Sequence, residues 1–94
     1  MEPRDEVILR KALSEIDIAE NRMGDHSLAE FNENEMLMRA ICMTVINIGE
    51  LVKTLSESFR RTHKYQTLKM GDVYETVQTD FPVLRVQTNS ILEE

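Results

Sequence analysis

The sequence predicts an all-α fold, an antiparallel helical bundle of three long helices plus short ones, formed by one domain over residues 1–94. Three observations predict it. Apolar residues recur at helical spacing in three stretches, no stretch alternates with period two over a useful length, and no turn-punctuated strand pairs occur. With 41% hydrophobic and 30% charged residues, the 94-residue chain can build one modest core.

The first helix is predicted from Asp5 to about Met23. Gly24 follows as its C-terminal stop, because glycine adopts the backbone conformation that ends many helices. Ser27 and, three residues later, Glu30 form a capping box for one short turn. The apolar residues of the first helix fall on one face: Leu9, Ala12, Leu13, Ile16, Ala19 and Met23.

The longest apolar-periodic run, residues 35–59, is predicted as a central helix that Asn32 or Asn34 caps and that ends near Phe59 to Arg61. Because its apolar stripe is so wide, we expect it to pack on more than one side. Gly49 costs about 1 kcal/mol relative to alanine inside a helix, which favours a close helix–helix contact there. The stripe comprises Leu37, Ile41, Thr44, Val45, Ile48, Leu51, Val52, Leu55 and Phe59, widened by Met36, Ala40 and Met43.

The last helix is predicted to begin at Asp72, with Glu75 completing a second capping box. Pro82 removes an internal hydrogen bond, so the helix is expected to kink or restart there, with Asp80 as a cap. Its first apolar face carries Val73, Tyr74, Val77 and Phe81, and Leu84, Val86, Ile91 and Leu92 continue it.

The net charge of −6 argues against nucleic-acid binding by the whole surface, since phosphates would be repelled. A local basic site stays open, because no acid occurs from Ser58 through Gly71. That window holds Arg60, Arg61, Lys64 and Lys69.

No apolar run reaches the length of a membrane span, and the N-terminus lacks an apolar signal core, so we expect a cytoplasmic protein with no membrane contact. The single Cys42 excludes an internal disulfide and is predicted to be a small buried residue. With two histidines and no clustered ligand spacing, we expect no metal and no cofactor; His26 alone in its loop is expected to be solvated.

Two segments resemble the HepT-like proteins of the HEPN superfamily. Residues 48–61, IGELVKTLSESFRR, are similar to the family's second long helix, and residues 73–84, VYETVQTDFPVL, to its last helix; residues 4–21 fit the first helix less specifically. The resemblance implies a homodimeric helical bundle. It also implies a metal-independent ribonuclease toxin, paired with a small nucleotidyltransferase antitoxin that adenylylates a tyrosine near the active site.

The family's active motif is an arginine followed, a few residues later, by His-x-Tyr. Carried over, it makes His63, Arg60 and Arg61 the catalytic candidates and Tyr65 the modified residue, although His63 can instead match a non-catalytic histidine that often follows Phe-Arg in the family. The chain departs from the pattern here: both arginines lie closer to His63 than in the family, and the usual Pro-Trp segment is missing. A stretch of the pattern is absent between Thr62 and Gln66, either because the sequence omits it or because the protein is a shortened relative.

The residue types suit metal-independent RNA cleavage. Histidine can take the 2′-hydroxyl proton, and arginine can hold the charge that builds on the phosphate. The alternative is a solvated helix C-terminus, whose cations favour the negative end of the helix dipole. Tyr65 could equally be a half-buried packing residue. Asn47 and Glu50 are candidates for a cleft or a dimer axis; alternatively, they form a hydrogen-bonded pair or lie on a solvent edge.

Three functions therefore remain open. The first is a HepT-like ribonuclease toxin, or a relative that retains its scaffold, acting on RNA as a homodimer. The second is a non-catalytic helical dimer that binds a nucleotidyltransferase partner or a nucleotide. The third is a plain structural dimer without a ligand.

Overall fold

The computed structural model describes residues 1–63 and 72–94, and every regular element in these two ranges is helical. The all-α prediction is confirmed for the described chain. The elements are α1 (Pro3–Met23), α2 (Leu28–Glu33), α3 (Glu35–Lys53), α4 (Glu57–Thr62), α5 (Val73–Glu75), the π-helical turn η1 (Thr76–Asp80) and α6 (Phe81–Leu92).

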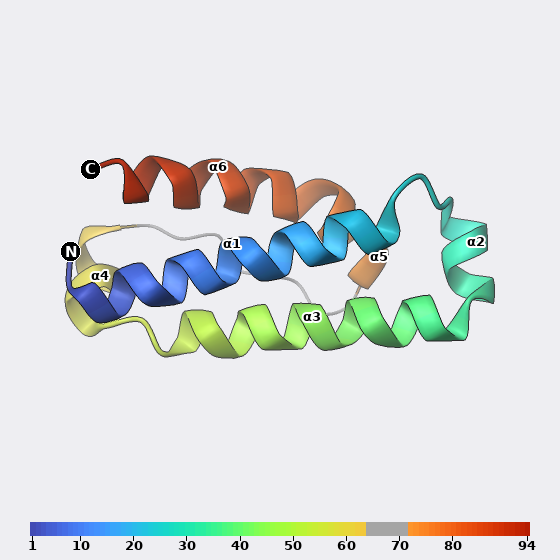
Figure 1. Ribbon diagram of the computed structural model, residues 1–94, viewed down its shortest axis with the longest axis horizontal. Helices are drawn as coiled ribbons and strands as arrows, with labels where there is room; N and C mark the ends of the chain where they lie inside the picture. Colours follow the sequence, from blue (N-terminus) through green and yellow to red (C-terminus); the bar gives the residue numbers. More distant parts are fainter. Residues whose placement is uncertain (64–71) are drawn as a thin grey trace.

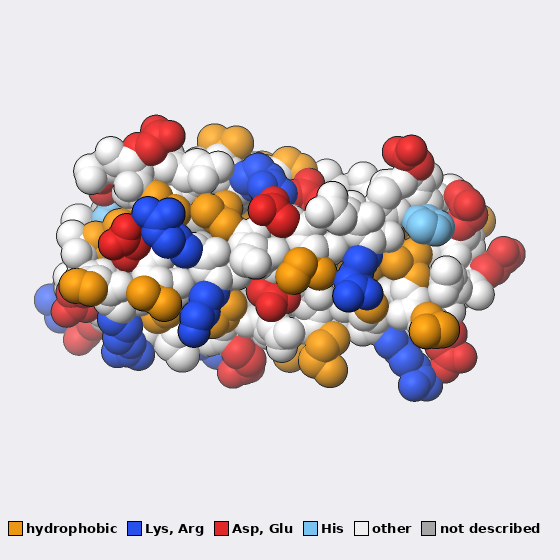
Figure 2. Space-filling model, in the orientation of Figure 1, with side chains coloured by type: hydrophobic (Ala, Val, Ile, Leu, Met, Phe, Trp, Pro, Cys, Tyr) orange, Lys and Arg blue, Asp and Glu red, His pale blue; other side chains and the backbone are white. Residues whose placement is uncertain are grey.

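The longer helices α1, α3 and α6 run along an elongated molecule of 42 × 20 × 18 Å (Figure 1). α1 runs opposite to both α3 and α6, α2 closes one end, and both chain termini lie at the other end beside α4. On the face drawn in Figure 2, acidic and basic side chains are interspersed and form no continuous basic patch. α1 packs against α3, η1 and α6, and α3 packs against α1, α2 and α5.

The helix predicted over residues 35–59 to pack on more than one side has several neighbours, but its apolar stripe is buried only in part. α3 buries one side only, through Ile41, Val45 and Ile48, and its opposite side faces solvent. Two residues expected to widen its buried stripe, Met36 and Met43, are 85% and 58% exposed. The apolar stripe of α3 therefore extends beyond the side of the helix that its neighbours bury.

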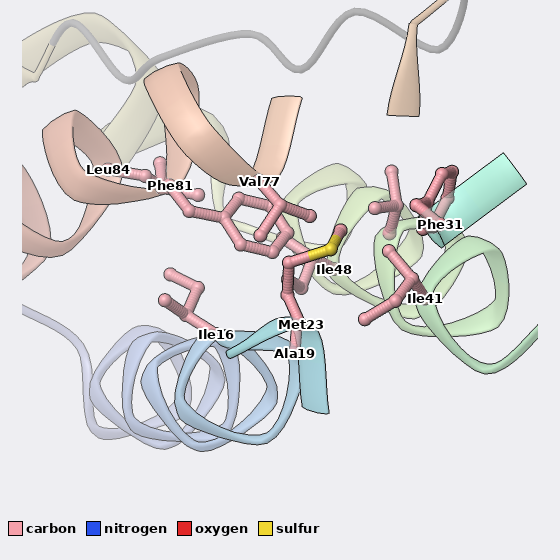
Figure 3. Packing of buried hydrophobic residues seen from close by; sticks show 10 residues of the cluster. Ile16, Ala19, Met23, Phe31, Ile41, Ile48, Val77, Phe81 and Leu84 are labelled. Atoms are coloured by element: carbon pink, nitrogen blue, oxygen red, sulfur yellow. The ribbon is translucent and has the colours of Figure 1, made fainter. Parts of the chain in front are cut away.

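The core is built on the apolar face of α1 (Figure 3). The apolar residues of this face recur at helical spacing, as predicted. Leu9, Ala12 and Ile16 are fully buried. The main cluster comprises Ile16, Ala19, Met23, Phe31, Ile41, Val45, Ile48, Val77, Phe81 and Leu84. A second cluster at the end of the molecule near α4 comprises Ile8, Leu9, Leu55, Phe59 and Ile91.

Several predicted helix ends are confirmed. Gly24, with φ of 49°, ends α1, and its N–H donates to the Glu20 carbonyl. Ser27 and Glu30 make the reciprocal bonds of a capping box, at 3.1 and 2.9 Å. Asn34, and not Asn32, caps α3. Short-range signals of this kind depend only on neighbouring residues, which is why the sequence reveals them.

The predicted continuous helix over residues 35–59 is interrupted after Lys53. The Thr54 hydroxyl donates to the Leu51 carbonyl at 2.7 Å, and Ser56 is extended, with ψ of 157°. The Ser56 hydroxyl accepts a hydrogen bond from the Phe59 N–H at 3.1 Å, so Ser56 starts a new helix, α4. This separate helix carries the residues at the centre of the functional hypothesis.

A π-helical turn precedes Pro82 at the point where the sequence predicts a kink or restart. The N–H of Phe81 donates to the Thr76 carbonyl, five residues back, and Pro82 then lies in the first turn of α6. Proline tolerates that position because its missing N–H is not needed there. The Asp80 side chain makes no cap, so that part of the prediction is wrong. Asp72 does cap α5, accepting from the Glu75 N–H at 3.0 Å.

Arg85 joins α6 to α1 through two carboxylates. It donates to Glu20 and to Asp17, and the side chains of Arg85 and Glu20 are each about one third exposed. The hydrogen bonds with Glu20 and Asp17 raise the pKa of Arg85 above its ordinary value, so it stays charged. These two ion pairs thus fix the position of α6 along α1.

Asp5 ties the start of α1 to the α3–α4 junction. Its carboxylate is 1% exposed and accepts from the Ser56 N–H at 2.9 Å and from the Ser56 hydroxyl at 2.6 Å. Burial raises the pKa of Asp5, but the hydrogen bonds from Ser56, with the charge of Arg4, outweigh it and hold the pKa below its ordinary value. Arg4 donates in turn to the Thr54 carbonyl at 2.8 Å.

We predict that Asp5→Asn destabilises the protein by about 1–3 kcal/mol at neutral pH, because charged hydrogen bonds to Ser56 are lost. A group with a lowered folded pKa contributes stability above its unfolded pKa, and that contribution is lost as the pH falls through the folded pKa. The difference between Asp5→Asn and the wild type should therefore begin to shrink as the pH falls below about 4 and go on shrinking as it passes through the lower folded pKa. Urea unfolding across this range measures it.

Glu6→Gln is the matched control, since Glu6 is the next residue of α1 but forms only an exposed pair with Arg10 at 2.9 Å. Its effect should stay below about 1 kcal/mol. Equal and pH-independent destabilisation by Asp5→Asn and Glu6→Gln would contradict the role assigned to Asp5.

The close helix contact expected at Gly49 is absent from the described chain. A Cβ atom added at Gly49 would meet no heavy atom within 4 Å.

We predict that Gly49→Ala stabilises the protein by about 0.5–1 kcal/mol, because alanine is the better helix former. Thermal and urea unfolding check it. Gly24→Ala is the control and should destabilise, since Gly24 has a positive φ; a destabilising Gly49→Ala would restore the close-contact reading.

Candidate functional site

α4 positions the three catalytic candidates. Arg60 and Arg61 lie in its last turn, and His63 is its C-terminal cap residue. The buried Phe59 anchors α4 in the second core cluster, so the helix has a fixed rotation. The structure brings the candidates together only because they are neighbours on one short helix.

His63 lies under the C-terminal end of the chain. Its Nε2 is 2.8 Å from a carboxylate oxygen of Glu94, and its ring stacks on Phe59 with the centroids 4.6 Å apart. The side chain is only 18% exposed. Its other nitrogen, Nδ1, is buried and meets no hydrogen-bond partner among the described residues. In this arrangement neither ring nitrogen is open to a substrate hydroxyl.

The two arginines have local partners. Arg60 donates to the Lys53 carbonyl, at the C-terminal end of α3, where a cation also suits the helix dipole. Arg61 pairs with Glu57, one turn earlier on α4, at 2.9 Å, and both side chains are more than 70% exposed. An exposed pair of this kind is worth less than about 1 kcal/mol, so Arg61 can leave Glu57 for an anionic ligand at little cost.

Tyr65, the predicted modified residue, lies outside the described residues, as does the junction at which the family pattern is interrupted. The predictions made for them stay predictions.

Two other polar candidates, Asn47 and Glu50, lie on a shallow groove between α1 and α3. Both are exposed, and Glu50 pairs with Lys53 at 3.3 Å. The groove is lined by Lys11, Ser14, Glu15, Asn47, Glu50, Leu51 and Thr54. Its mixed charge favours neither an anionic nor a cationic ligand.

His26 and Cys42 differ from their predicted surroundings. His26 is half-buried, with Nδ1 2.7 Å from the Met23 carbonyl at the end of α1, and is not simply solvated. Tyr74 covers the same loop, donating to the His26 carbonyl at 3.0 Å. Cys42 is half-buried rather than buried, because it lies at the edge of the buried side of α3.

Sequence reasoning missed Glu94 and Phe59 as the surroundings of His63. Glu94 is 31 residues from His63, and no local pattern links them. Phe59 is four residues before His63, which is the spacing of neighbours on one helix face. The sequence predicted that the helix ends before His63, so this contact was not expected.

Neither a metal centre nor a membrane segment stands out. No group of three or more metal-ligating side chains gathers in the part of the chain that the structure describes. Every helix within residues 1–63 and 72–94 is too short or too polar to cross a bilayer.

The chain was compared with family models, with curated proteins and with solved structures. None of the three comparisons finds a match.

Proposed function

We propose that the chain is a HepT-like protein of the HEPN superfamily that keeps the scaffold of a ribonuclease toxin. In this proposal it acts in the cytoplasm as a homodimer that binds a nucleotidyltransferase partner. Support comes from the helical structure of both segments that carry the resemblance, although the break after Lys53 divides the first of them. Residues 48–61 cover the end of α3 and α4, and residues 73–84 cover α5, η1 and the start of α6.

The observation that favours binding over cleavage is the environment of His63. A general base must reach the proton that it removes. The Nε2 atom of His63 already meets Glu94, and Nδ1 is enclosed by protein. The ring stacked on Phe59 therefore works as a structural link between α4 and the end of α6.

Ribonuclease activity is the second candidate, favoured by the grouping of Arg60, Arg61 and His63 on one short helix. Catalysis would require the pair between His63 and Glu94 to open, exposing Nε2. The exposed Arg61 would then be available to hold the charge of the phosphate.

We predict that the wild-type protein cleaves RNA no faster than the His63→Ala variant. The measurement is cleavage of a fluorescent single-stranded RNA without metal, with circular dichroism to confirm the fold. His26→Ala is the matched control, because it removes the other histidine of the chain. Cleavage by the wild type and by His26→Ala that falls about 100-fold or more in His63→Ala would establish the ribonuclease instead.

We also predict that a HepT-type nucleotidyltransferase with ATP transfers AMP to Tyr65 and not to Tyr74. The hydroxyl of Tyr74 is engaged with the His26 carbonyl, and its ring lies against Phe31 with the centroids 5.6 Å apart. Intact-mass spectrometry of the wild type, Tyr65→Phe and Tyr74→Phe distinguishes the two sites. Modification that persists in Tyr65→Phe would contradict the assignment.

A further inference from the structure

α3 exposes an apolar stripe on the side that faces away from the core. The buried residues Ile41, Thr44, Val45 and Ile48 mark its inner side. We call the opposite side the outer face of α3; successive residues on it are three or four positions apart. They are Met36, Arg39, Met43, Ile46, Glu50 and Lys53. Met36, Met43 and Ile46 are 85%, 58% and 46% exposed, so three of the exposed large apolar side chains of the described residues lie on this one face.

The four central residues of this outer face, Arg39, Met43, Ile46 and Glu50, are arranged symmetrically about a point between residues 44 and 45. Met43 and Ile46 lie at equal distances on either side of that point, and so do Arg39 and Glu50. When a second copy of α3 lies antiparallel to the first, an apolar residue therefore faces an apolar residue and a cation faces an anion. Beyond these four residues the relation ends, because Met36 lies opposite Lys53.

We propose that the outer face of α3 is the surface through which two copies of this chain associate, with their α3 helices antiparallel and the two-fold axis between residues 44 and 45. Met43 of one copy then packs against Ile46 of the other, and Arg39 meets Glu50. This rests on the homodimer of the proposed function and is independent of RNA cleavage. A two-fold interface requires a self-complementary surface, and an unrelated partner would not require it.

The charged residues of the outer face are free to change partners. Arg39 pairs with Glu35 at 2.7 Å, and Glu50 pairs with Lys53 at 3.3 Å, within the same helix. All four side chains are at least 69% exposed. Pairs so exposed contribute less than about 1 kcal/mol, so exchanging them across an interface costs little. The neighbouring groove with Lys11 and Glu15 supplies a polar rim beside the apolar centre.

A charge exchange tests the interface. Arg39→Glu and Glu50→Arg should each raise the dimer dissociation constant about tenfold, because each variant opposes like charges across the axis. The double variant, Arg39→Glu with Glu50→Arg, should return to within about threefold of the wild type, since both cross-helix pairs are restored with reversed sign. Sedimentation equilibrium at about 50 mM salt, where screening is weak, measures these constants.

Arg10→Glu is the matched control. It makes the same charge change and breaks the same kind of pair, with Glu6 one turn away, but it lies on α1. Its dissociation constant should stay within about twofold of the wild type.

Ile46→Glu should give a folded monomer at concentrations where the wild type is a dimer, because it puts a charge beside the two-fold axis.

A dimer that withstands Ile46→Glu and the single charge reversals would overturn this interface and leave the proposed homodimer standing. A wild-type monomer at about 100 μM would overturn both the interface and the homodimer. Neither result would bear on the ribonuclease assay, so the interface proposal and the proposal about RNA cleavage can fail independently of each other.

Discussion

The buried carboxylate of Asp5 fixes the geometry at one end of the molecule. By accepting two hydrogen bonds from Ser56 it determines how α1 meets the junction at which α3 ends and α4 begins. The α4 helix then places Phe59 in the second core cluster. The ring of His63 stacks on Phe59 and pairs with Glu94, two residues after α6. One charged group, kept ionised by its donors, thus connects three segments that are distant in sequence.

Most of what the sequence predicted correctly depends on neighbouring residues. The apolar face of α1, the glycine at its end, and the caps at Ser27, Asn34 and Asp72 are determined within one or two helical turns. The break after Lys53 was missed because its main support, Asp5, is 51 residues from Ser56. The Ser56 cap was a local signal that the continuous apolar stripe overrode.

The candidate site was predictable in its residue types but not in its surroundings. The sequence identified a histidine and two arginines close together, and the structure places them on one short helix. It did not reveal that His63 would be only 18% exposed and paired with Glu94, since that contact depends on how α6 returns along α1. The width of the α3 stripe was misread for a related reason: periodicity counts apolar residues, but it does not tell whether a side of the helix faces the core or another surface.

The contact between α1 and α6 has a consequence for how the chain folds. Arg85 is 68 residues from Asp17, and the main core cluster needs Val77, Phe81 and Leu84 beside Ile16 and Ala19. Although helical proteins usually fold through local contacts, this core brings the first helix together with the last. During synthesis α1 therefore leaves the ribosome long before α6, the second of the two long helices that cover it. Until α6 follows, the part of the apolar face of α1 that packs against α6 stays open to other chains and to chaperones.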